Sequence, residues 1–135
     1  MIKNKTGGII ALVVAIILIA ALAWLIVYSK HHTIPGNVNL EDGAVLDAEK
    51  CAEINDVTMI HSASCPHCAV AVPILRELEQ ELNMTFSYYD LSIDKDKETL
   101  VSLGMIPTHI PTAVINCKVY VGVRTKEEYK EAILG

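Results

Sequence analysis

Two cysteines three positions apart are the residues of this sequence best suited to chemistry. Cys65 and Cys68 enclose Pro66 and His67 in a Cys-Pro-His-Cys motif. An apolar stretch ends and an amphipathic segment begins there, so we expect the motif where a strand gives way to a helix. The unpaired N–H groups and positive dipole end at a helix N-terminus stabilise a thiolate. Such a thiolate is a nucleophile at neutral pH, and the spacing favours thiol–disulfide exchange.

The two residues between the cysteines fit this interpretation. Pro66 suits the first helical position, because the N–H that proline lacks is not needed there. His67 places a polar, sometimes positively charged group beside Cys65. A more stable thiolate makes the reduced form more stable and the disulfide more oxidising. We therefore predict Cys65, Cys68, Pro66 and His67 as the catalytic residues.

A metal site is the alternative interpretation of the cysteine pair. Zinc normally takes four ligands, often from two such pairs. The other cysteines, Cys51 and Cys117, are single, which favours thiol–disulfide chemistry over zinc or copper binding. We predict no metal and no cofactor. Copper handling, or redox sensing without turnover, stays the alternative function of the motif.

The first part of the chain is apolar enough to cross a membrane. Thr6 to Ser29 are 24 residues without a charge. As a helix they would span roughly 36 Å, more than the roughly 30 Å hydrocarbon core. The run is apolar on every side, unlike a helix buried by a small domain. We predict a transmembrane helix over residues 7–28, with Trp24 and Tyr28 at the interface.

Two details bear on processing and orientation. Residues 21–23 (Ala-Leu-Ala) match a signal-peptide cleavage pattern, but the apolar run continues through Val27 and favours an uncleaved signal anchor. Lys3 and Lys5 precede the span, and Lys30 alone follows it closely. This bias predicts a single-pass protein of the cell membrane, with its domain on the extracytoplasmic side.

His31 and His32 follow the apolar run directly. Two adjacent histidines are a candidate metal pair, but no partner ligand lies nearby in the sequence. We interpret them as polar residues at the membrane interface.

The rest of the chain reads as one acidic domain. After Ser29 there are 9 Lys and Arg residues against 16 Asp and Glu residues. The absence of a basic stripe argues against nucleic acid as a partner. Residues 30–43 contain a Pro-Gly turn signal and no apolar periodicity, which predicts a linker. We therefore divide the chain into a tail and anchor (1–29), a linker (30–43) and a globular domain (44–135).

Apolar patterns in the domain predict alternating helices and strands. Helical periodicity occurs in four segments: 44–55, 69–82, 95–103 and the residues after Thr125, which forms a capping-box pattern with Glu128. Four stretches read as strands: 57–61, 84–91, 112–116 and 118–123. A β-α-β unit followed by a hairpin and a helix implies an α/β fold, with a mixed sheet and helices on both faces.

Three features in order make the chain resemble the thioredoxin superfamily, from about Val45 to its end. The first is the strand at 57–60, followed by Cys-Pro-His-Cys and a helix. The second is Pro73, five residues after Cys68, where the family has a helix-kinking proline. The third is His-Ile-Pro-Thr at 109–112, which is similar to the family's cis-proline loop.

This resemblance implies a thioredoxin-like fold, with a central mixed sheet of about four strands flanked by helices. It implies a thiol–disulfide oxidoreductase that forms a mixed disulfide at Cys65, which Cys68 then resolves. Substrate would pair with the Ile110 backbone beside a cis Pro111. Pro107 lies in a second Ile-Pro-Thr, but we assign the cis proline to Pro111 because a strand directly follows it. The implied partners are protein thiols or disulfides and a redox partner protein.

The sequence also departs from the family pattern. The Pro-His pair resembles that of DsbA-type periplasmic oxidases, whereas the short domain resembles thioredoxin or glutaredoxin. The direction, oxidase or isomerase against reductase, therefore stays open. Met59 occupies the position of the family's buried acid, and Ser64 replaces its tryptophan. His61 is a candidate proton carrier, or else a polar residue at the end of a strand.

The family topology also bears on the two single cysteines. It would make the strands at 57–61 and 112–116 antiparallel neighbours, with Cys65 and Pro111 at one pole. Cys51 and Cys117 would then both lie at the opposite pole. A structural disulfide between them is one expectation; two separate buried thiols are the other.

Overall fold

The computed structural model describes residues 5–31 and 37–135, with side chains for 8–28 and 37–135. The chain divides into two units, Met1–Ile34 and Pro35–Gly135. The side chains of His31 and His32, on which we made a prediction, lie outside the described residues, as do linker residues 32–36.

The first unit consists of one helix, α1 (Lys5–His31). The stretch Gly8–Tyr28 is 21 residues long and apolar enough to cross a membrane, and none of its residues is buried. The rings of Trp24 and Tyr28 stack with their centroids 5.4 Å apart, because residues four apart share one face of a helix. A long helix that is apolar all round and packs into no core matches the predicted N-terminal helix.

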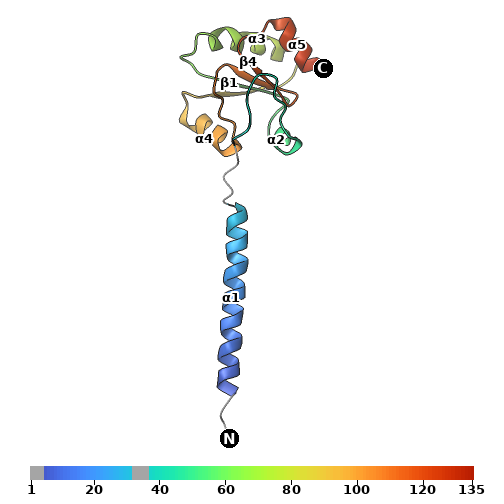
Figure 1. Cartoon of the computed structure of the whole chain (residues 1–135). Helices are drawn as coiled ribbons and strands as arrows, with labels where there is room; N and C mark the ends of the chain where they lie inside the picture. The colour runs from blue at the N-terminus through green and yellow to red at the C-terminus, as the bar shows by residue number, and fades with distance from the viewer. Residues whose placement is uncertain (1–4, 32–36) are drawn as a thin grey trace. The chain divides into compact units, whose positions relative to one another are not determined.

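The second unit is a four-stranded sheet with helices on both faces (Figure 1). Its elements are α2 (Ala48–Ala52), β1 (Val57–His61), α3 (Cys68–Glu81), β2 (Ser87–Asp90), α4 (Asp94–Leu103), β3 (Thr112–Ile115), β4 (Lys118–Val121) and α5 (Lys126–Leu134). The strand order is β2-β1-β3-β4. β1 and β2 are parallel, whereas β1–β3 and β3–β4 are antiparallel. The predicted mixed sheet is confirmed.

The core lies on both faces of β1, the central strand before the cysteine motif. Val57 and Met59 pack in the cluster that contains Leu75 of α3 and Tyr129 of α5. Ile60 packs in the opposite cluster with residues of α4 and the loop after it. A strand covered on both faces needs apolar residues at successive positions, which explains the buried run in β1. β1 therefore gives the following loop a fixed starting point.

The folded unit begins earlier in the chain than the predicted boundary at residue 44. Leu40 is buried in the core, the Val38 N–H donates to the Gly104 carbonyl at 2.7 Å, and Asp42 pairs with Arg124 at 2.7 Å. Residues 37–43, assigned to the linker from their sequence, therefore pack on the domain. Their contacts are with distant parts of the chain, and local periodicity does not report such contacts.

The helix predicted over 44–55 is shorter in the structure. Only Ala48–Ala52 is helical, with Asp47 as its N-cap. Val45 instead forms an antiparallel bridge with Lys118, and the Leu46 N–H donates to the Cys117 carbonyl at 2.8 Å. This pairing with the β4 region keeps residues 45 and 46 extended, so the helix starts only at Ala48. The Gly104 helix end (φ 67°) and the Thr125–Glu128 capping box match their predictions.

Candidate active site

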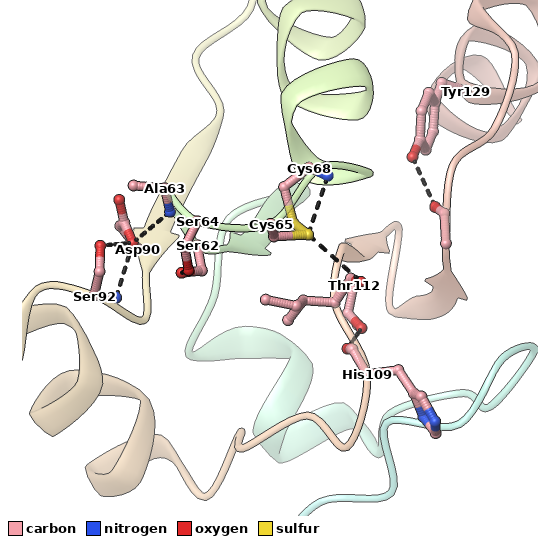
Figure 2. The surroundings of a disulfide bond; sticks show 12 residues. Ser62, Ala63, Ser64, Cys65, Cys68, Asp90, Ser92, His109, Thr112 and Tyr129 are labelled. Atoms are coloured by element: carbon pink, nitrogen blue, oxygen red, sulfur yellow. Dashed lines mark hydrogen bonds between the residues drawn. A yellow bond between two sulfur atoms is a disulfide. The ribbon is translucent and has the colours of Figure 1, made fainter.

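The cysteine pair lies in the turn between β1 and α3. The structure joins Cys65 and Cys68 by a disulfide, with their Cα atoms 5.2 Å apart (Figure 2). Cys68 is the first residue of α3. Its backbone N–H donates to Cys65 Sγ at 3.1 Å, so an unpaired donor of the helix N-terminus points at the first sulfur. This is the geometry that stabilises a thiolate.

The two sulfurs differ in access to solvent. Cys65 is half-buried, whereas Cys68 is 2% exposed. An incoming thiol or disulfide can therefore reach Cys65 more easily than Cys68. Thiol–disulfide exchange uses one sulfur to attack the substrate and a second to resolve the mixed disulfide, and a difference in access suits these two roles.

Pro66 and His67 lie in the turn, both exposed, before the helix begins. The prediction that Pro66 occupies the first helical position is therefore wrong, because α3 begins at Cys68. The Ala69 N–H donates to the Cys65 carbonyl, four residues earlier, at 3.2 Å, so the motif turn runs directly into α3, which begins at Cys68. His67 is the N-cap residue, but its side chain makes no capping hydrogen bond. The sulfur of Cys65 accepts from the helix end instead.

The loop before β3 supplies the other side of the site. The Ile110–Pro111 peptide bond is cis, and the Ile110 carbonyl oxygen lies 3.8 Å from Cys65 Sγ. The Thr112 hydroxyl donates to the His109 carbonyl at 2.6 Å, as Figure 2 shows. The Pro111 carbonyl accepts from Gly122 N–H at 2.8 Å. These bonds hold the backbone of Ile110 against the first sulfur.

Asp90 is a site residue that sequence reasoning missed. Its Oδ1 accepts from the Ala63 N–H at 3.3 Å, in the turn before the motif, and from the N–H and hydroxyl of Ser92 (Figure 2). The Ser92 hydroxyl, the Ser92 N–H and the Ala63 N–H hold the Asp90 pKa below its usual value, against the opposing effect of burial. Asp90 thus fastens the active-site turn to β2. An Asp two residues before a Ser is a known turn pattern, but the contact with Ala63 depends on strand register.

A shallow pocket of about 230 Å³ adjoins the second sulfur. It is lined by His61, Ser62, Ala63, Cys68, Ala69, Val72 and Pro73. His61 is the last residue of β1, and Pro73 lies inside α3. Burial is the largest effect on the His61 imidazole and lowers its pKa, against the opposing charge of Asp90.

The other two cysteines lie at the opposite end of β3. A disulfide joins Cys51 in α2 to Cys117 in the β3–β4 turn, with their Cα atoms 5.4 Å apart. Asn116 and Cys117, the two turn residues, have positive φ angles, as tight hairpins require. Pro111 precedes β3 and Cys117 follows it, so the two disulfides lie at opposite poles of the domain. Among the side chains that the structure describes, no group of three or more His, Cys, Asp or Glu could hold a metal ion.

Loss of the Cys51–Cys117 disulfide should destabilise the domain. The bond closes a loop of 66 residues, and its removal releases chain entropy in the unfolded state. We expect the Cys51→Ser/Cys117→Ser variant to lose about 2–4 kcal/mol of unfolding free energy in urea. An unchanged midpoint would show that the bond contributes nothing to stability. Glu98→Gln, at an exposed position of α4, is a control with no disulfide to lose.

Comparisons with known proteins found a sequence relative and a structural neighbour. No family model matches the sequence. A probable thioredoxin from Methanothermobacter thermautotrophicus is 28% identical over 79 residues, which are 58% of this chain and 91% of that protein. A glutaredoxin structure from Archaeoglobus fulgidus covers 69% of this chain and 100% of its own, at 20% identity and a TM-score of 0.46. The four-stranded sheet and the cysteine pair at the start of α3 form the thioredoxin-like fold that the sequence predicts, and the sequence is similar to that thioredoxin over 79 residues.

Proposed function

We propose that the protein is a thiol–disulfide oxidoreductase that exchanges disulfides with protein substrates through Cys65 and Cys68. The observation that carries this proposal is the 3.1 Å contact from the Cys68 N–H to Cys65 Sγ at the start of α3. It stabilises negative charge on the more accessible sulfur, which is the one that must attack. His67 is exposed beside it and adds positive charge when protonated.

The difference in burial supports a separate role for each sulfur. In the reducing direction, the Cys65 thiolate attacks a substrate disulfide, forms a mixed disulfide and releases one substrate thiolate. The Cys68 thiolate then attacks Cys65 Sγ, closes the Cys65–Cys68 bond and releases the second substrate thiolate. In the oxidising direction the same steps run backwards. Both directions pass through one mixed disulfide, which buried Cys68 cannot form as readily.

The substrate chain is proposed to lie along the loop at Ile110 and Pro111. This loop places a backbone carbonyl within 3.8 Å of Cys65 Sγ, and Ile110 is half-buried rather than covered. An extended peptide can pair with exposed backbone groups at such a place. Main-chain pairing depends on no particular side-chain sequence in the substrate.

We further propose that α1 tethers the domain to the cell membrane. Apolar side chains are exposed all along Gly8–Tyr28, so lipid is the environment that suits them. Lys3 and Lys5 before the span favour an extracytoplasmic domain. The Cys51–Cys117 disulfide supports that side, because disulfides persist in oxidising compartments. A redox partner protein must then renew the Cys65–Cys68 pair.

Substitution of each active-site cysteine should separate the two steps. We expect Cys65→Ser to abolish turnover of a disulfide-containing protein substrate, because the attacking sulfur is gone. Cys68→Ser should form mixed disulfides but not resolve them, and these should appear as reducible adducts on non-reducing gels. Normal turnover by Cys65→Ser would refute the proposed function. Stoichiometric copper binding without turnover by the unaltered protein would instead favour copper handling.

The membrane tether has its own test. The full chain should stay with the membrane fraction after carbonate washing, whereas a chain that lacks residues 1–29 should appear in the soluble fraction. A cysteine-reactive probe that does not cross membranes should label Cys65 in intact cells after mild reduction. Release of the full chain by carbonate, or labelling only after cell lysis, would contradict the proposed tether or its orientation.

A further inference from the structure

The resolving step of the proposed exchange has a proton to remove. Cys68 must attack as a thiolate, yet its side chain is 2% exposed. Burial in apolar surroundings favours the neutral thiol. Bulk water therefore has little access to the sulfur outside the pocket that adjoins it, so a proton acceptor in that pocket would assist the step.

The pocket beside Cys68 contains one such acceptor. Among the seven residues that line it, His61 is the titratable group besides Cys68 itself. The pocket volume of about 230 Å³ leaves room for bridging water, since one water takes about 30 Å³ in the liquid. The imidazole and the buried sulfur thus share one small space at the end of β1.

The surroundings of His61 suit a group that takes up a proton and gives it back. Burial, the largest effect, lowers the pKa of His61 below its usual value and so favours the neutral ring. Asp90 on β2 and Asp96 on α4 favour the protonated ring, whereas Arg76 on α3 opposes it. The Tyr88 ring of β2 meets the imidazole edge-on, with centroids 6.4 Å apart. The neutral form is therefore available, and two carboxylates stabilise the imidazolium once formed.

We propose that His61 accepts the Cys68 proton during resolution of the mixed disulfide, across the pocket that both residues line. The inference rests on the proposed function. The proton moves from Cys68 Sγ to the imidazole, and the sulfur electron pair forms the bond to Cys65 Sγ. The bond from Cys65 to the substrate sulfur breaks, and its electron pair leaves on the substrate thiolate. The imidazolium then returns the proton to solvent or to that thiolate.

A chromogenic aromatic disulfide separates the two steps in the full-length reduced protein in detergent. Attack by Cys65 releases the first coloured thiolate, and resolution by Cys68 releases the second. We expect His61→Gln to leave the first phase unchanged and to slow the second about 100-fold at pH 7, the lower range of general-base effects. The second phase of the unaltered protein should rise with pH as His61 becomes neutral. In His61→Gln the rate of the second phase should rise only at the pH at which the Cys68 thiol itself ionises.

Two further variants exclude a merely structural effect. Ser62→Ala changes the same pocket without removing a base, and its second phase should keep the original pH profile. Imidazole added to the His61→Ala variant should restore the rate of the second phase, in proportion to the concentration of neutral imidazole. An unchanged rate and pH profile in His61→Gln would overturn the inference alone, because both phases would still be present. If the unaltered protein released no first thiolate, the proposed function itself would fail.

Discussion

One contact at the start of α3 governs the chemistry of this domain. The Cys68 N–H lies 3.1 Å from Cys65 Sγ, at the end of a helix whose N-cap residue offers no side-chain acceptor. The first sulfur therefore takes the place of a cap. A helix end without a cap leaves donors that favour a negative charge, and in the proposed function that charge is the Cys65 thiolate.

The rest of the fold keeps the helix end and its neighbours in place. β1, buried on both faces, leads into the motif turn, and Asp90 fastens that turn to β2. Lys126 of α5 bridges Glu77 and Glu81 of α3, which ties the far part of α3 to the last helix. The loop before β3 presents the Ile110 carbonyl from the opposite side. The site therefore draws on residues that are distant in sequence but belong to neighbouring strands.

Local patterns predicted most of the fold, because strands, caps and helix ends have signatures within a few residues. Gly104 and the Thr125 capping box are examples. Contacts between distant segments had no such signature. Leu40 in the core and the bond from Ala63 to Asp90 both depend on how the chain packs and on strand register. The predicted start of α3 at Pro66 was wrong by two residues, because the helix begins at Cys68.

The most direct test of the account is the pKa of the Cys65 thiol. It can be measured in the reduced Cys68→Ser variant of the full chain, from the pH dependence of alkylation by iodoacetamide. Serine keeps the backbone N–H that points at the sulfur. We predict a pKa at least about one unit below the 8.5 of a free cysteine. A value at or above about 8.5 would contradict the claim that the start of α3 stabilises the thiolate.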